Sequence, residues 1–420
     1  MVFTIAAQWC GVQDDIQAEA ARRQAAINNN GDPWPMKRSF CSLASVALLA
    51  AGVSACSGGS STSSSAAPST LLAQVDTGAR GAMRNLSSTD LSKLMSPGIN
   101  LGNTLEALPN ETAWGNPVPT QTLMNAYKTA GFKTVRIPVS WSQYADANNN
   151  ISATWLAHVR QVVDYAHNAG LYTIINIHWD GGWMNHPTYD QQAAINAKLT
   201  RFWTQIANTF KNYDDTLLFA GSNEVGQDNT WGPPTAEYAA VQNGFNQTFV
   251  NAVRATAGNN AQRHLVVQGY FTNIDNTAGF NTVPHDSVAN RLFMEVHYYD
   301  PYHFTLDGGS NIWQWGVNAS APSAVEAWAN EPWADTEFQK MKASFGDKGV
   351  PVLLGEFGAG MKDKYPGMNT YRKYWDQYIT RSAFQHGLVP VYWDTGGMID
   401  RNTGAQLDRD VIDLIVKASK

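Results

Sequence analysis

The sequence predicts a (β/α)8 barrel, the TIM-barrel fold, for residues 81–420. After about residue 95, eight short runs rich in β-branched and apolar residues recur, and longer segments of helical periodicity separate most of them. Strands that are apolar on both faces belong in a parallel sheet covered by helices. Eight strand and helix units in one domain are typical of a closed barrel.

The expected strands follow one another at regular intervals along this domain. They span residues 99–104, 134–141, 172–179, 217–224, 264–270, 292–300, 350–358 and 388–395. The expected helices span residues 123–130, 155–169, 193–210, 238–256, 336–344, 369–386 and 409–417. The segment 272–290 shows no clear helix. A doubly wound open sheet is the alternative, but it would favour a glycine-rich phosphate turn after the first strand, which residues 100–104 lack.

Composition limits the partners of this domain. The chain carries 29 Lys and Arg against 35 Asp and Glu, a formal charge of −6, so nucleic acid is not an expected partner. It also contains 15 Trp, 16 Tyr and 16 Phe, more flat apolar surface than a core needs. Part of this surface is expected to bind a ligand.

The first 80 residues carry an export signature. Residues 36–55 run from a basic start into a short apolar stretch that ends before Cys56, the order of a secretory signal peptide. The end of this segment, residues 53–56, resembles a bacterial lipobox, which predicts acylation of Cys56 and an outer-membrane or cell-surface lipoprotein. Plain secretion is the alternative. Residues 56–80 are a Ser/Gly-rich tether, and we interpret residues 1–35 as an upstream segment that precedes the true start at Met36.

The cysteines do not reach the predicted barrel. Cys10, Cys41 and Cys56 all lie within the first 56 residues. The barrel can therefore form neither an internal disulfide nor a thiolate zinc site.

Polar residues gather where the predicted strands end, which is the functional face of such a barrel. They are Arg136, His178, Asn223, Glu224, His297, Tyr299, Glu356 and Trp393. Glu224 and Glu356 follow the fourth and seventh strands, which lie across the mouth from one another. Two facing carboxyl groups are what glycoside hydrolysis requires.

Six motifs in chain order resemble glycoside hydrolase family 5, and the opening segment 98–107 looks like the start of its bacterial endoglucanases. The motifs are residues 134–141 (TVRIPVSW), 176–178 (NIH), 222–224 (SNE), 296–299 (VHYY), 355–358 (GEFG) and 393–394 (WD). The resemblance covers almost all of residues 95–420. It implies a retaining endo-β-1,4-glucanase that acts on cellulose or related β-glucans.

The resemblance implies distinct roles for the two glutamates, with Glu224 as acid/base and Glu356 as nucleophile. Glu356 must be ionised, and Arg136 and the Tyr299 hydroxyl can stabilise its charge. Glu224 must begin protonated, which a less polar setting and the negative charge of Glu356 favour.

The remaining strand-end residues are expected to bind the sugar. Asn223 is suited to hydrogen-bond the sugar 2-hydroxyl, and Trp393 to form the floor on which a sugar ring stacks. His178 and His297 are expected to line the same subsite. Tyr298 alternates with His297 and Tyr299, so it should face away from the mouth.

We expect no cofactor and no catalytic metal. A zinc site from His178, His297 and a glutamate is conceivable, but no His-x-His or His-Glu-x-x-His spacing supports it. The expected partner is a β-linked polysaccharide, and the enzyme is expected to be a monomer.

Loop tryptophans are candidates for an extended cleft, because an endo-acting enzyme must hold several sugars. Trp114 and Trp183 are the preferred subsite residues. Further candidates are Trp179, Trp231, Trp313 and Trp315, and about half of the loop tryptophans should instead plug the core. Many relatives carry a second histidine where this chain has Trp179. This departure leaves open whether the substrate is a plain or a decorated glucan.

Three functions therefore remain to be separated. The main prediction is an endoglucanase. A mannanase or xyloglucanase on the same scaffold is the alternative within the enzyme class. A non-catalytic sugar-binding protein is the alternative outside it, although binding alone needs no facing pair of glutamates.

Overall fold

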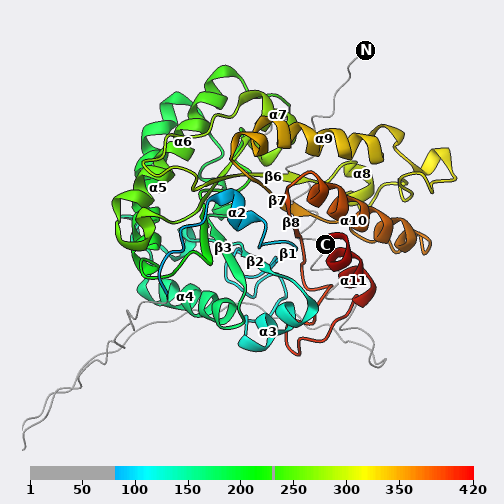
Figure 1. Ribbon diagram of the computed structural model, residues 1–420, viewed down its shortest axis with the longest axis horizontal. Coiled ribbons are helices and arrows are strands. Elements are labelled where there is room, and N and C mark those ends of the chain that lie inside the picture. Colours follow the sequence, from blue (N-terminus) through cyan, green and yellow to red (C-terminus); the bar gives the residue numbers. More distant parts are fainter. Residues whose placement is uncertain (1–80, 229–231) are drawn as a thin grey trace, which may run out of the picture.

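The computed structural model describes residues 81–228 and 232–420, which form one closed barrel of eight parallel strands (Figure 1). Each strand pairs with the next in chain order, and β1 closes the ring by pairing with β8. The strands are β1 (Gly98–Asn100), β2 (Thr134–Ile137), β3 (Tyr172–Asn176), β4 (Leu217–Ala220), β5 (Leu265–Gln268), β6 (Leu292–Tyr298), β7 (Val352–Phe357) and β8 (Val389–Tyr392). The predicted (β/α)8 fold is confirmed.

Helices surround the barrel in chain order, as Figure 1 shows. The long ones are α3 (Gln121–Ala130), α4 (Ala153–Asn168), α5 (Tyr189–Thr209), α6 (Ala236–Ala255), α9 (Glu331–Ser344), α10 (Met368–Gln385) and α11 (Arg409–Ala418). Each overlaps one of the seven expected helices. The strands end earlier than expected. Three of the polar site residues still lie within strands, namely Arg136, His297 and Glu356, whereas the others follow their strands in loops at the barrel mouth.

One expectation about the helices is wrong. The segment 272–290 contains the short helix α7 (Ile274–Phe280). The Asn273 side chain caps it by accepting a hydrogen bond from the Asn276 backbone N–H. Ile274 and Thr277 lie on the buried face of this helix. Seven residues with a glycine near the end give too weak a periodic signal to be recognised, so tertiary packing decides this element.

Local sequence also explains where the longer helices begin and end. Thr120 caps α3 by accepting from the Leu123 N–H, and Thr235 caps α6 by accepting from the Tyr238 N–H. Helix α3 ends at Gly131, which adopts a φ of 108° that glycine tolerates without strain.

The end of the barrel opposite the polar mouth is closed by the segment that precedes β1. This segment contains α2 (Ser88–Ser92), which lies in front of the strands in Figure 1. Leu91 and Met95 are fully buried and pack against barrel-interior side chains, among them Leu218 and Phe293. Burial of each such side chain stabilises the fold by about 1.5–3 kcal/mol. Leu91 and Met95 thus fill the end of the barrel interior opposite the mouth.

Several predicted features lie outside the described residues: the upstream segment 1–35, the signal peptide 36–55, the tether 56–80 with Cys56, and Trp231. Within residues 81–228 and 232–420, no helix combines the length and the apolar character needed to cross a membrane. Three short helical elements lie in the long loop after β6. They are α8 (Tyr302–Thr305) near its start and the 3-10 turns Pro322–Ala324 and Ala327–Ala329, the second of which precedes α9.

Candidate active site

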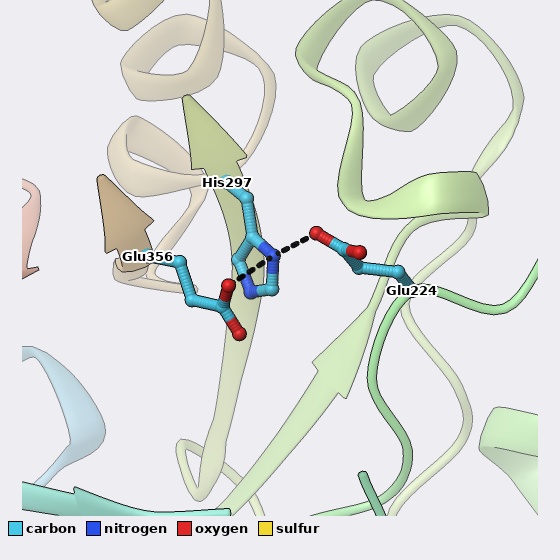
Figure 2. Close-up of side chains that lie close together, drawn as sticks. All are labelled: Glu224, His297 and Glu356. Atoms are coloured by element: carbon cyan, nitrogen blue, oxygen red, sulfur yellow. Dashed lines mark hydrogen bonds and ion pairs between the residues drawn. The ribbon is translucent and has the colours of Figure 1, made fainter. Parts of the chain in front are cut away.

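The barrel brings the predicted catalytic residues together at its mouth (Figure 2). Glu224 follows β4, His297 lies on β6 and Glu356 lies on β7. In Figure 2 the imidazole of His297 lies between the two glutamates. Its Nδ1 atom is 2.7 Å from Glu224 Oε1 and 3.7 Å from Glu356 Oε2.

The separation of the two carboxyl groups fits one class of hydrolysis. One ring nitrogen of His297 and one carboxylate oxygen each of Glu224 and Glu356 all lie within 4.8 Å of one another. Retaining glycosidases place their carboxyl groups about 5–5.5 Å apart, whereas inverting enzymes need roughly 6.5–9.5 Å to admit a water molecule. The observed pair is therefore close enough for direct attack by one carboxylate and too close for the inverting arrangement.

Arg136 on β2 organises the base of this site. The guanidinium is fully buried and donates hydrogen bonds from Nη1 to Glu356 Oε1 and to Asn100 Oδ1, both at 2.9 Å. Its Nη2 donates to Asn223 Oδ1 at 2.7 Å, and its Nε lies 2.9 Å from Glu295 Oε1. One side chain thus joins residues from or next to β1, β4, β6 and β7.

The Arg136 contact also orients Asn223. Because the amide oxygen of Asn223 accepts from Arg136, its amide NH₂ group is turned the other way. An amide that is fixed in this way can donate to a sugar hydroxyl, as the sequence predicts.

Charge and burial shape the two carboxyl groups differently. Burial raises the pKa of Glu356, and the positive charges of His297 and Arg136 oppose this effect. The Glu356 side chain is 7% exposed, whereas that of Glu224 is 24% exposed. The nucleophile candidate is therefore enclosed by cationic partners, and the acid/base candidate lies on the solvent side.

His297 and His178, the two histidines predicted at the mouth, differ in charge. Burial acts to lower the pKa of His297, but Glu356, Glu224 and Glu295 outweigh it and raise that pKa to about 9. Burial, reinforced by the positive charges of Arg136 and His297, lowers the pKa of His178 well below its ordinary value. Near neutral pH His297 is therefore a cation and His178 is neutral.

Tyr299 and Tyr298 have separate surroundings, as their alternation predicts. The Tyr299 hydroxyl donates to Glu356 Oε2 at 3.2 Å, and burial raises the pKa of this hydroxyl well above its ordinary value, so it keeps its proton. Tyr298 is buried and packs against Phe338 of α9 and Trp375 of α10.

Trp393 lies just after β8 with its indole ring parallel to the imidazole of His178. Their ring centroids are 5.7 Å apart and their planes differ by 9°. Gly102 leaves room for this indole, since a Cβ atom there would lie 3.0 Å from Trp393 Cζ2 and 2.8 Å from the Asp394 carbonyl oxygen. The half-buried Trp393 is thus fixed from two sides at the edge of the mouth.

The loop tryptophans differ in how far they are covered. Trp114 is half-buried in the loop after β1. Trp183 is half-buried as well, and its Nε1 donates to Asp180 Oδ2 at 2.7 Å while Lys198 Nζ lies 4.3 Å from the ring centroid. Subsite roles for these two residues stay predictions.

Trp313 and Trp315 pack against helix and loop aromatics. Trp313 stacks on Tyr365, with ring centroids 5.4 Å apart. Trp315 is fully buried and donates to the Ala329 carbonyl oxygen, so its suggested role as a sugar platform is wrong, because no part of its ring reaches the surface. It plugs the space beneath the long loop after β6.

Three polar residues of the site were not predicted from the sequence. Asn100 donates to the Gly355 carbonyl oxygen at 2.8 Å as well as accepting from Arg136. Glu295 and Gln268 lie deeper, where Gln268 Nε2 donates to Glu295 Oε2 at 2.6 Å. Glu295 precedes His297 by two positions, so strand alternation already places both side chains on the same face. The alternation thus pointed to Glu295, but this residue lies inside its strand and not at the carboxyl end where functional residues were expected.

The Glu224, His297 and Glu356 group also offers donor atoms of the kinds that bind metal ions. The hydrogen bond between His297 Nδ1 and Glu224 Oε1 already joins two of these atoms. The expectation that catalysis needs no metal stays a prediction, which activity in the presence of a chelator would check.

Comparison with known proteins decides the family. The family model described as Cellulase (glycosyl hydrolase family 5) matches residues 99–398, almost the entire barrel. The chain belongs to glycoside hydrolase family 5. The resemblance read from the six sequence motifs is confirmed, and so is the assignment of the chain as a glycoside hydrolase.

Individual family 5 members are similar over most of their length. A xyloglucan-specific endo-β-1,4-glucanase of Bacteroides ovatus is 43% identical, over 80% of this chain and 71% of that protein. Endoglucanase A of Paenibacillus barcinonensis is 40% identical, over 75% of this chain and 84% of that protein. The structure of a Bacteroides ovatus family 5 xyloglucanase with a XXXG heptasaccharide superimposes with a TM-score of 0.78 and 42% identity, over 81% of this chain and 78% of that one.

The contact between Arg136 and Glu356 predicts a pH effect. Arg136→Met removes a positive charge that lowers the pKa of Glu356, so that pKa should rise. The acidic limb of the kcat/KM profile should then move to higher pH by about one unit or more, measured with an aryl β-glycoside.

Arg372→Met is the matched control for this variant. Arg372 is a buried arginine of α10 that contacts Asp408 and Asn369. Its loss should lower stability but leave the acidic limb where it is. An acidic limb that stays at the wild-type pH in Arg136→Met would contradict the role given to Arg136.

Proposed function

We propose that this family 5 hydrolase is an endo-β-1,4-glucanase that cleaves internal glucosidic bonds with retention of configuration. The observation that carries the proposal is the close facing pair Glu224 and Glu356, which have carboxylate oxygens within 4.8 Å of one another. The 40% identity to a named endoglucanase supports the choice of a β-1,4-glucan.

In the first step Glu356 attacks the anomeric carbon. Its carboxylate is held by Arg136 Nη1 at 2.9 Å and by the Tyr299 hydroxyl at 3.2 Å. Glu224 gives its proton to the glycosidic oxygen as the bond from C1 to that oxygen breaks, and the bonding electron pair leaves with the oxygen. The product of this step is a covalent glycosyl-enzyme.

In the second step the roles of Glu224 reverse. Its carboxylate takes a proton from a water molecule while the water oxygen bonds to C1. The bond between C1 and Glu356 breaks, and its electron pair returns to the carboxylate. Two displacements at C1 restore the original configuration and regenerate both side chains.

Binding of the sugar relies on the rest of the mouth. Asn223, oriented by Arg136, is placed to donate to the 2-hydroxyl, and Trp393 offers an indole face to the sugar ring. His178, neutral and next to Trp393, can accept or donate a single hydrogen bond.

Xyloglucan is the second candidate substrate. The Bacteroides ovatus relative is named as xyloglucan-specific, and a Paenibacillus pabuli structure with 39% identity and a TM-score of 0.75 is described as a family 5 xyloglucanase. Trp179 is half-buried next to His178, at the position where many relatives carry a second histidine. These observations favour activity on a decorated glucan alongside plain β-1,4-glucan.

We further propose that the enzyme is an exported monomer held to a membrane through a lipid on Cys56. The lipobox-like residues 53–56 and the Ser/Gly-rich stretch after them support this location. Cys56→Ser should move the activity from the membrane fraction to the soluble fraction. Activity that stays in the soluble fraction for the wild-type chain would contradict the anchor.

Removal of the nucleophile should be repairable by a small anion. Glu356→Gly should lower hydrolysis of a natural glucan by several orders of magnitude, because no glycosyl-enzyme can form. Added azide should restore turnover of an activated aryl cellobioside and give a glycosyl azide of inverted configuration. Unassisted activity near the wild-type level would remove Glu356 as nucleophile.

The acid/base residue has a matched experiment. Glu224→Ala should lose most activity on natural glucans and little of the first step on activated aryl glycosides, which need no proton.

A panel of soluble cellulose, mixed-linkage glucan, mannan and xyloglucan separates the substrate candidates. Sugar binding by the wild-type chain without hydrolysis of any member would instead favour a non-catalytic sugar-binding protein.

A further inference from the structure

A third glutamate, Glu295 on β6, lies beneath the catalytic pair. Its side chain is fully buried and shielded from any substrate by the residues above it. One carboxylate oxygen, Oε1, is 2.9 Å from Arg136 Nε and 3.4 Å from His297 Nε2. The other oxygen accepts from Gln268 Nε2 at 2.6 Å.

The fold makes a dedicated space for this carboxylate. A Cβ atom at position 355 would lie 2.0 Å from Glu295 Oε1, so the glycine next to Glu356 is required for the group to fit. Gln268 in turn accepts from the Ser222 backbone N–H at 2.9 Å, which ties Glu295 to the segment that carries Glu224. Glu295 is thus fixed from β2, β5 and β6 together.

The imidazole of His297 faces a carboxylate on each side. Its Nδ1 is 2.7 Å from Glu224 Oε1, and its Nε2 is 3.4 Å from Glu295 Oε1. A carboxylate can only accept, so an imidazole between two of them carries a proton on each nitrogen or on the one nearer the stronger charge. Burial acts to raise the pKa of Glu295, but the positive charge of the neighbouring Arg136 and the hydrogen bonds that Glu295 accepts outweigh this effect and lower that pKa. Glu295 therefore remains ionised.

We propose that Glu295 is a positioning residue that keeps a proton on His297 Nε2, so that the second ring proton lies at Nδ1 on the hydrogen bond to Glu224. The Glu295, His297 and Glu224 array then acts as the proton supply of the acid/base residue. This inference rests on the proposed function, since it concerns the proton that Glu224 transfers.

The proton count of the array balances through the reaction. Transfer of the Nδ1 proton to Glu224 Oε1 gives neutral His297, which keeps its Nε2 proton towards Glu295, and a protonated Glu224. Glu224 passes that proton to the glycosidic oxygen as the C1–O bond breaks. In the second step Glu224 takes a proton from water and returns it to His297 Nδ1, which restores the imidazolium and the Glu224 carboxylate, so no further donor is needed.

Charged and titratable groups from five elements of the barrel face His297 and set its pKa. The groups that face it are Glu295 on its own strand, Glu224 after β4, Glu356 on β7, Arg136 on β2 and His178 after β3. The three carboxylates hold the pKa of His297 at about 9 against burial. Removal of the Glu295 charge must lower that pKa, because one anion that favours the imidazolium is lost.

The test is the pH profile of Glu295→Gln, which keeps the size of the side chain and removes its charge. The basic limb of kcat/KM on an unactivated cello-oligosaccharide should move to lower pH by about one unit or more. At the wild-type optimum, kcat/KM on that substrate should fall about 10- to 100-fold. On 2,4-dinitrophenyl β-cellobioside, whose leaving group needs no proton, the fall should be less than about threefold.

Two variants serve as controls. Glu295→Asp keeps the charge and should keep the basic limb close to its wild-type position even if the rate falls. Asp376→Asn removes another fully buried carboxylate, one that lies on α10 and accepts from the Ala359 backbone N–H. It should affect stability without moving the basic limb.

Equal losses on both substrates, or a basic limb that does not move in Glu295→Gln, would overturn the inference and leave the proposed function intact. Failure of the wild-type enzyme to hydrolyse either substrate would contradict the proposed function itself. If Glu295→Gln does not fold, ¹⁵N NMR of the histidines in the wild-type enzyme, assigned with His297→Asn, decides the matter. Protons on both His297 nitrogens near pH 7 support the inference, and an Nε2 without a proton overturns it.

Discussion

The contact between the buried Arg136 guanidinium and the carboxylates of Glu356 and Glu295 is the interaction on which the site depends. Carboxylates buried at a barrel mouth would take up protons if no cation were present, because burial penalises the charged form. Arginine suits this position, since it stays charged under burial and its planar fork reaches several acceptors at once. Its other two partners, Asn100 and Asn223, accept hydrogen bonds from Nη1 and Nη2.

The closed barrel explains how one side chain reaches so many strands. Parallel pairing of β1 with β8 brings the carboxyl ends of all strands to one face, and the opposite face is closed by Leu91 and Met95. Loss of one member of such a buried network leaves its partners charged and unpaired, at a typical cost of about 3–5 kcal/mol. The stability of the barrel interior and the ionisation of Glu356 are therefore coupled.

Three glutamates surround one histidine, yet they differ in function because their environments differ. Glu356 lies against Arg136 and Tyr299, Glu224 lies on the solvent side next to His297, and Glu295 lies beneath both without access to substrate. A nucleophile, a proton donor and a fixed counter-charge thus arise from the same residue type. The imidazolium of His297 links all three, since it contacts each carboxylate.

Much of the fold and the centre of the site could be predicted from sequence, because both follow strict periodicity. Eight apolar runs gave the strands, and the polar residue at the end of each run gave Arg136, Glu224, His297 and Glu356. The rest depends on tertiary packing. Helix α7 is too short for a clear periodic signal, and the burial of Trp315 depends on how the loop after β6 folds over α10. Strand alternation already places Glu295 on the same face as His297, but its contact with Arg136 forms only when the barrel brings β2 and β6 together.

Covalent trapping tests the central claim, that Glu356 is a carboxylate nucleophile held ionised at the base of the mouth. A 2-deoxy-2-fluoro-cellobiosyl fluoride should inactivate the enzyme, because its fluorine slows both steps while the good leaving group keeps the first one possible. Mass spectrometry of the digested enzyme should then find the sugar on the peptide that contains residues 352–357, attached to Glu356. A sugar attached to Glu224, or hydrolysis without any covalent adduct and with an inverted product, would contradict the account.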